Sequence, residues 1–89
     1  MIFVNKKIFL KRIKELREEA NLTQKALGLA VGVNRDVIHT IERGQSYNPD
    51  HAVLLADYFK VSLDYLYGRT DNRKGKYFGE ETAALEPAV

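Results

Sequence analysis

The sequence predicts an all-α fold, a compact bundle of five short helices. Apolar residues recur three and four positions apart, whereas no segment alternates at period two for long enough to make a sheet. Capping residues and glycines divide residues 7–68 into helix-length pieces. The chain has 89 residues and is expected to be one small domain with a modest core. We expect an N-terminal extension over 1–6, the folded domain over 7–68, and a flexible or loosely docked tail over 69–89.

The first helix is predicted from about Lys7 to Ala20. Its charged faces leave one apolar stripe at positions i, i+4, i+7 and i+11, formed by Phe9, Ile13, Leu16 and Ala20. Asn21 follows as a C-cap, because asparagine tolerates the left-handed conformation.

The stretch ALGLAVGV, residues 26–33, admits several interpretations. Its two glycines suit a membrane-helix contact or a phosphate-binding loop, and its apolar run suits a buried strand. The run is far shorter than the roughly 18 residues of a spanning helix, and no Lys-Ser or Lys-Thr follows the second glycine. We therefore interpret it as the end of one helix and the turn into the next.

The second helix is predicted from Gln24 to Val31, with Thr23 as its N-cap. Gly28 leaves room for a neighbouring helix, and Gly32 supplies the left-handed residue that the turn requires. Val33 fills the angle that follows.

The third helix is predicted from the N-cap Asn34 to Arg43, with Gly44 as its stop. Ile38 and Ile41 share a face that can meet Leu27 and Val31, which makes the pair a helix-turn-helix unit.

The fourth and fifth helices follow a loop, QSYNP. Pro49 and Asp50 begin the fourth helix, which bears Ala52, Leu55, Ala56 and Phe59 on one face. Ser62 caps a last short helix, LDYLY, and Gly68 closes it. We interpret His51 as a surface histidine.

Composition excludes several classes of function. The chain has no cysteine, so no zinc finger or disulfide is possible, and we expect a cytoplasmic protein. No apolar run or signal peptide indicates a membrane role. Two isolated histidines do not make a metal site, and no nucleophile and base share a helical spacing. We therefore predict no enzyme, no cofactor, no metal and no small-molecule ligand.

The charge is unevenly distributed although the net charge is only +2. Residues 1–20 carry six basic side chains against three acidic ones, and residues 69–76 carry four against one. Basic ends around a near-neutral middle suit an anionic partner, although solvated charged faces also explain such runs.

Residues 7–68 resemble the DNA-binding domain of the lambda repressor and Cro class, the XRE family. The matching elements are LTQ, the turn at Gly32 and Val33, IERG, and VSLDYL, all at the spacing of that family. The resemblance implies a sequence-specific DNA-binding protein whose third helix lies in the major groove of double-stranded DNA.

When its isoleucines face inward, the third helix carries on the rest of its surface Arg35, Asp36, His39, Thr40 and Arg43. The candidate base-reading residues are Asn34, Arg35, Asp36 and Thr40. Arg35 matches guanine O6 and N7, Asp36 matches the amino group of cytosine, and Thr40 suits a base edge or a thymine methyl. Asn34 doubles as N-cap. Asp36 is also explained by the helix dipole alone.

Candidate phosphate contacts surround these residues. The resemblance implies that Gln24 bonds a phosphate and supports the reading helix. The further candidates are Lys25, His39, Arg43, Tyr47 and Asn48, the last two standing where related repressors often carry a lysine or arginine.

Two structural roles complete the set. The resemblance implies an ion pair between Arg17 and Glu42, and Glu42 needs a partner because it lies where the helix dipole disfavours a carboxylate. A homodimer is also implied, with its contact formed by Leu63, Tyr65 and Tyr67, which offer more apolar surface than one small core needs.

Two functions remain open. One is a transcription regulator, a repressor that binds a pseudo-palindromic operator as a homodimer. The other is an interaction module of the same fold, such as an antitoxin, which binds a protein partner. Apolar residues at the termini favour the second function if they do not simply pack against the bundle: Met1, Ile2, Phe3, Val4, Tyr77 and Phe78.

Overall fold

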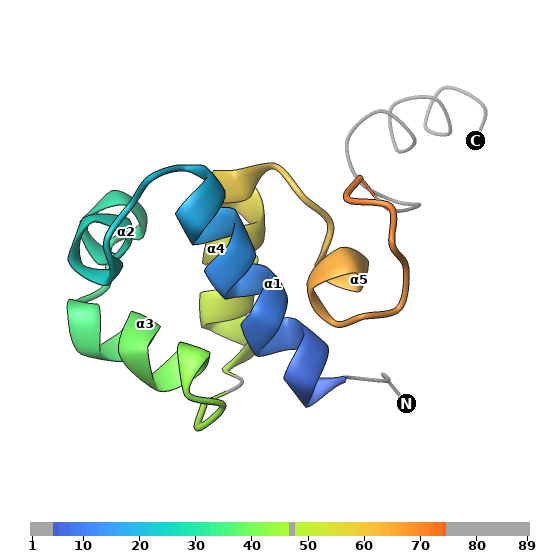
Figure 1. Ribbon diagram of the computed structural model, residues 1–89, viewed down its shortest axis with the longest axis horizontal. Coiled ribbons are helices and arrows are strands. Elements are labelled where there is room, and N and C mark those ends of the chain that lie inside the picture. Colours follow the sequence, from blue (N-terminus) through green and yellow to red (C-terminus); the bar gives the residue numbers. More distant parts are fainter. Residues whose placement is uncertain (1–4, 47, 75–89) are drawn as a thin grey trace.

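A computed structural model describes residues 5–46 and 48–74 of the chain. These residues form helices α1 (Lys6–Glu19), α2 (Gln24–Val31), α3 (Arg35–Glu42), α4 (Pro49–Phe59) and α5 (Leu63–Leu66), and they form no strand. Helices α2 and α3 lie at one end of the molecule and α5 at the other, with α1 between them (Figure 1). The prediction of an all-α fold is confirmed.

Side-chain caps determine where the helices begin. Thr23, Asn34 and Ser62 each accept a hydrogen bond from the backbone N–H three residues later, as predicted. Two further caps were not predicted from the sequence. Asn5 accepts from the N–H of Ile8, so that α1 begins at Lys6, and Asn48 accepts from the N–H of Asp50.

Left-handed residues end each of the five helices or follow its end, and after α3 and α5 they are the predicted glycines Gly44 and Gly68. Gly32 has a φ of 88°, as the turn between α2 and α3 requires. Asn21, with a φ of 59°, lies one position beyond Ala20, the C-cap of α1. Lys60 ends α4 with a φ of 60°, which no sequence signal indicated.

One core connects the elements. Phe9, Ile13 and Leu16 of α1 are buried in one cluster that has members from every other helix. The other members of the core are Leu27, Ile38, Ile41, Ala52, Leu55, Ala56, Val61, Tyr65 and Leu66. Because α2 and α3 each bury only one face in this core, their remaining faces are presented together at one end of the molecule.

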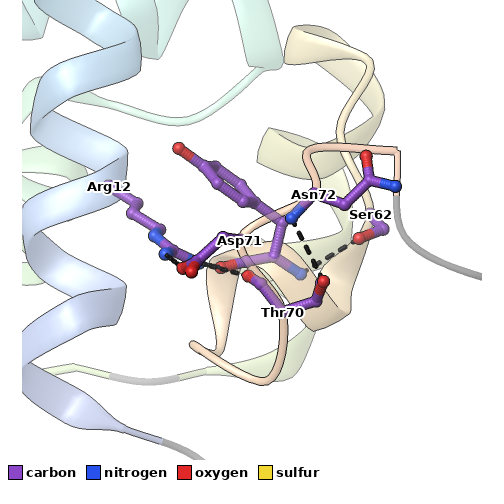
Figure 2. Close-up of polar contacts among 6 residues, drawn as sticks. Arg12, Ser62, Thr70, Asp71 and Asn72 are labelled. Carbon is purple, nitrogen blue, oxygen red and sulfur yellow. Dashed lines mark hydrogen bonds and ion pairs between the residues drawn. The ribbon is translucent and has the colours of Figure 1, made fainter.

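Residues 69–74, which we call the strap, are held against α1 and α5. The Arg12 guanidinium donates to the carbonyl oxygens of Tyr65 at 2.5 Å and Thr70 at 2.7 Å, and to Asp71 at 2.6 Å. Figure 2 shows Arg12 reaching from α1 toward Thr70 and Asp71. This part of the expected tail is therefore docked by specific hydrogen bonds, while residues 75–89 lie outside the described ranges.

Two more contacts fix the end of the strap. The backbone N–H of Ser62 donates to the carbonyl oxygen of Arg73 at 2.7 Å. The Arg73 side chain forms an ion pair with Glu19 at 2.6 Å. The hydrogen bond that Arg73 donates to Glu19 raises the pKa of Arg73 above its ordinary value.

The buried position of Tyr65 corrects one argument for dimerisation. Its side chain is only 6% exposed, and the Arg12 guanidinium lies 4.1 Å from the centre of its ring. Leu63 and Tyr67 are half-buried and pack against the core. Tyr65 therefore belongs to the core of the bundle, whereas Leu63 and Tyr67 keep part of their surface exposed.

Candidate nucleic-acid interface

The angle between α2 and α3 depends on Gly28. A Cβ atom at this position would lie 2.7 Å from the carbonyl oxygen of Val33 and 3.2 Å from that of Asn34. The backbone N–H of Val33 donates to the carbonyl oxygen of Gly28 at 2.8 Å. The close approach that the sequence predicts is therefore made by the turn between the helices and the start of α3.

A half-buried polar cluster joins α1, α2 and α3. Arg17 of α1 forms a two-point contact with Glu42 of α3, at 2.6 Å from Nε to Oε2 and 3.0 Å from Nη2 to Oε1. Gln24 of α2 donates its amide to Glu42 Oε1 at 3.2 Å. The hydrogen bond with Glu42 raises the pKa of Arg17 above its ordinary value. The cluster ties the end of α3 to the beginning of α2.

The candidate base-reading residues lie along the outer side of α3. Asn34, Arg35 and Asp36 are exposed at its start, and Thr40 follows one turn later. The side chains of Arg35 and Asp36 are 59% and 81% exposed, with their charged atoms 3.6 Å apart. This contact is a weak surface pair, so both groups remain available to a ligand.

Two of these side chains already make hydrogen bonds within α3. The Asn34 oxygen accepts from the N–H of Val37 at 3.1 Å, so its amide NH₂ is the group left for a ligand. The Thr40 hydroxyl donates to the carbonyl oxygen of Asp36 at 2.7 Å. Thr40 can therefore offer a ligand its lone pairs and its methyl group.

The candidate phosphate contacts border this row on two sides. Lys25 lies beside Gln24 in the first turn of α2, where the N–H groups of a helix have no partner within the helix. His39 and Arg43 are exposed on and directly after α3. Asn48 is exposed but uses its side-chain oxygen to cap α4. Tyr47 lies outside the described residues.

Two hollows flank the beginning of α3. The first, of about 480 Å³, lies between α2 and α3 and is lined by Lys25, Leu29, Val33, Asn34, Arg35 and Asp36. The second, of about 240 Å³, lies between α3 and α4 and is lined by Asn34, Asp36, Val37, Thr40, Ser46 and His51. The start of α3 thus stands as a ridge between two depressions.

His51 differs from the surface histidine expected. It is half-buried between α3 and α4, and its Nδ1 atom is buried without a hydrogen-bond partner among the residues described. Its neighbours include Val37, Ile38 and Leu54. His51 is half-buried because the start of α4 lies beside Val37 and Ile38, a contact that sequence periodicity does not reveal.

Neither a metal cluster nor a membrane span is found in the described parts of the chain. No three potential metal ligands among these residues gather in one place. No helix over the same ranges is long and apolar enough to cross a bilayer.

Comparison with known proteins agrees with this geometry. A family model described as helix-turn-helix matches residues 13–66, which run from the middle of α1 to the end of α5. No curated protein and no solved structure matches the chain significantly. The match spans more than half of the chain and contains α2, the turn at Gly32 and α3. The chain therefore belongs to the XRE-type helix-turn-helix family of DNA-binding regulators.

Proposed function

We propose that the protein is a sequence-specific transcription regulator, a repressor that binds a pseudo-palindromic operator as a homodimer. One observation carries the proposal: exposed Asn34, Arg35 and Asp36 and half-buried Thr40 form a row along α3, which the Arg17–Glu42 pair holds against α1. A row of donors and acceptors on a rigid helix suits readout of base edges in the major groove.

Phosphate contacts give this row its register on the duplex. Lys25 follows Gln24 at the start of α2 and Arg43 follows Glu42 at the end of α3, and the Gln24–Glu42 hydrogen bond brings these two ends together. The first N–H groups of α2 have no partner within the helix. Such contacts set orientation and supply the salt-dependent share of affinity. In a homodimer the two half-sites would lie about 34 Å apart on one side of the duplex.

The test is to select duplexes from a random pool and then to compare two variants on the selected site. Arg35→Ala should lose preference at one base pair, with about 1 to 3 kcal/mol less discrimination there. Gln24→Ala should weaken binding to all sequences alike, because a phosphate contact carries no base information. Equal and uniform losses in the two variants would contradict this division of roles.

The second candidate is a protein-interaction module of the same fold. Three exposed apolar side chains on α4, those of Val53, Leu54 and Tyr58, favour it. Leu54 and Tyr58 are four residues apart and share one side of the helix. Gel shifts with competitor DNA separate the candidates. Binding to selected duplexes that is no tighter than binding to random duplex would support the interaction module and exclude the regulator.

A further inference from the structure

Leu29 is an apolar side chain in a polar position. It is 75% exposed, more than any other large apolar side chain in the described ranges. It lies on the side of α2 that faces away from the core, where a solvated helix ordinarily carries a polar residue. Single exposed leucines are common, so exposure alone assigns no role to it. Its neighbours do suggest one.

The hollow between α2 and α3 places Leu29 among the candidate DNA contacts. Lys25 and Leu29 are four residues apart on α2 and so lie on the same side of that helix. Leu29 and Val33 supply the apolar part of the lining, and Arg35 and Asp36 complete it from α3. Leu29 therefore shares this hollow with a candidate phosphate contact and with candidate base-reading residues.

The occupant that fits this arrangement is an apolar group carried by an anionic polymer. Two cations, Lys25 and Arg35, border an apolar surface only two side chains wide. A protein partner needs a wider continuous patch, whereas the other exposed apolar side chains lie on α4. Among the edges of the bases in the major groove, the C5 methyl of thymine is the apolar group.

We propose that Leu29 contacts the C5 methyl group of a thymine next to the base pair read by Arg35, and so makes the protein prefer thymine there. The inference rests on the proposed function and adds a specificity-determining residue from α2 to the row on α3. Lys25, on the same side of α2, would hold the adjacent phosphate and press Leu29 against the base edge.

Single methyl groups can be removed from the DNA to test this contact. Each thymine of the selected site is replaced in turn by deoxyuridine, which pairs identically but lacks the methyl group. For the wild-type protein, one replacement per half-site should weaken binding about fourfold, the equivalent of about 0.8 kcal/mol for one buried methyl-sized group. For Leu29→Ala the same replacement should have no effect.

A matched control uses another exposed apolar side chain. Val53→Ala removes such a side chain from α4 and should keep the wild-type response to deoxyuridine. Thermal melting should show that Leu29→Ala is folded, since its side chain contributes little to the core. The inference is overturned if no thymine is sensitive, or if every sensitive thymine weakens binding of wild type and of Leu29→Ala equally. A pool that yields no preferred sequence would refute the proposed function itself, and the inference with it.

Discussion

Glu42 accepts three hydrogen bonds at the end of a helix whose dipole disfavours its charge. Two come from Arg17 and one from Gln24. The side chains of Arg17 and Glu42 are 13% and 6% exposed, so solvent screens their attraction little. Removing either partner leaves the other charge without a counter-ion in a site with little access to solvent, and an unpaired charge in such a site destabilises the folded state.

We therefore expect Arg17→Ala and Glu42→Ala each to lower the free energy of unfolding by about 3 kcal/mol. The double variant should lose clearly less than the sum of the two, because it leaves no unpaired charge. Denaturant unfolding of the four proteins measures the coupling. Arg35→Ala is the control, since its exposed contact with Asp36 should contribute no more than about 1 kcal/mol. Additive losses at Arg17 and Glu42 would contradict the prediction.

The Glu19 contact makes part of the stability depend on pH. The hydrogen bond from Arg73 lowers the pKa of Glu19 below its ordinary value. A carboxyl group whose pKa is lower in the folded state stabilises the protein above its unfolded pKa, about 4.3 for glutamate, and this contribution is lost as the pH falls through the folded pKa.

We expect Glu19→Gln to be less stable than the wild type at neutral pH and equally stable in acid, where Glu19 itself is neutral. Unfolding midpoints measured from neutral pH down to about pH 3 follow this convergence. Glu15→Gln, on the same helix, shows how much of any effect follows from removing a carboxylate of α1. A gap between wild type and Glu19→Gln that stays constant or widens in acid would disprove the prediction.

Between elements, the contact that matters most for the interface is the one at Gly28. Alanine there would favour the helix by about 1 kcal/mol, but its Cβ would meet the backbone of the turn, which cannot rotate away as a side chain can. The α2–α3 angle would have to open, and overpacking of this kind typically costs about 1 to 3 kcal/mol.

Gly28→Ala should therefore lower both the thermal midpoint and the affinity for selected DNA. Gly32→Ala separates backbone strain from steric overlap. No atom lies within 4 Å of the added Cβ, but the backbone has a φ of 88°, which alanine disfavours. This variant should lose about 1 to 2 kcal/mol of stability through backbone strain alone. A Gly28→Ala variant with wild-type stability and affinity would show that the angle is not fixed at this contact.

Most helix boundaries could be predicted because they depend on residues that interact with near neighbours in the sequence. The helix starts could be predicted at Thr23, Asn34 and Ser62, because each cap accepts a hydrogen bond from the N–H only three residues later. The turn at Gly32 could be predicted because glycine favours the left-handed conformation found there. The turn at Lys60 could not, because lysine has no preference for the left-handed conformation that it adopts at the end of α4. At the site, helical periodicity predicted which side of α3 faces outward. It did not predict that the Thr40 hydroxyl donates a hydrogen bond to the carbonyl oxygen of Asp36.

Over the whole molecule, the strap lay beyond what the sequence could predict. Arg12 bonds backbone carbonyl oxygens that lie 53 and 58 positions along the chain, and such acceptors exist at every residue. No residue pattern distinguishes them. The strap extends the folded unit beyond Leu66, where the family match ends, through hydrogen bonds that hold residues 69–74 to α1 and α5.

Two shortened chains test the contribution of the strap. A chain ending at residue 74 keeps these contacts, and a chain ending at residue 68 leaves Arg12 without Thr70 and Asp71. The shorter chain should be less stable by about 2 kcal/mol, since hydrogen bonds to a charged group are lost, and its thermal midpoint should fall by about 10 °C. Equal midpoints for the two chains would show that the strap does not contribute to stability.

The same pair of chains should differ in the lifetime of the native state. The strap joins segments far apart in sequence, and its binding site exists only once α1 and α5 have come together, so its contacts form late in folding. Interactions absent from the transition state slow unfolding and leave the folding rate unchanged. In stopped-flow experiments, the two chains should refold equally fast, while the chain ending at residue 74 unfolds more slowly. The strap would then act as a latch that closes after the domain has folded.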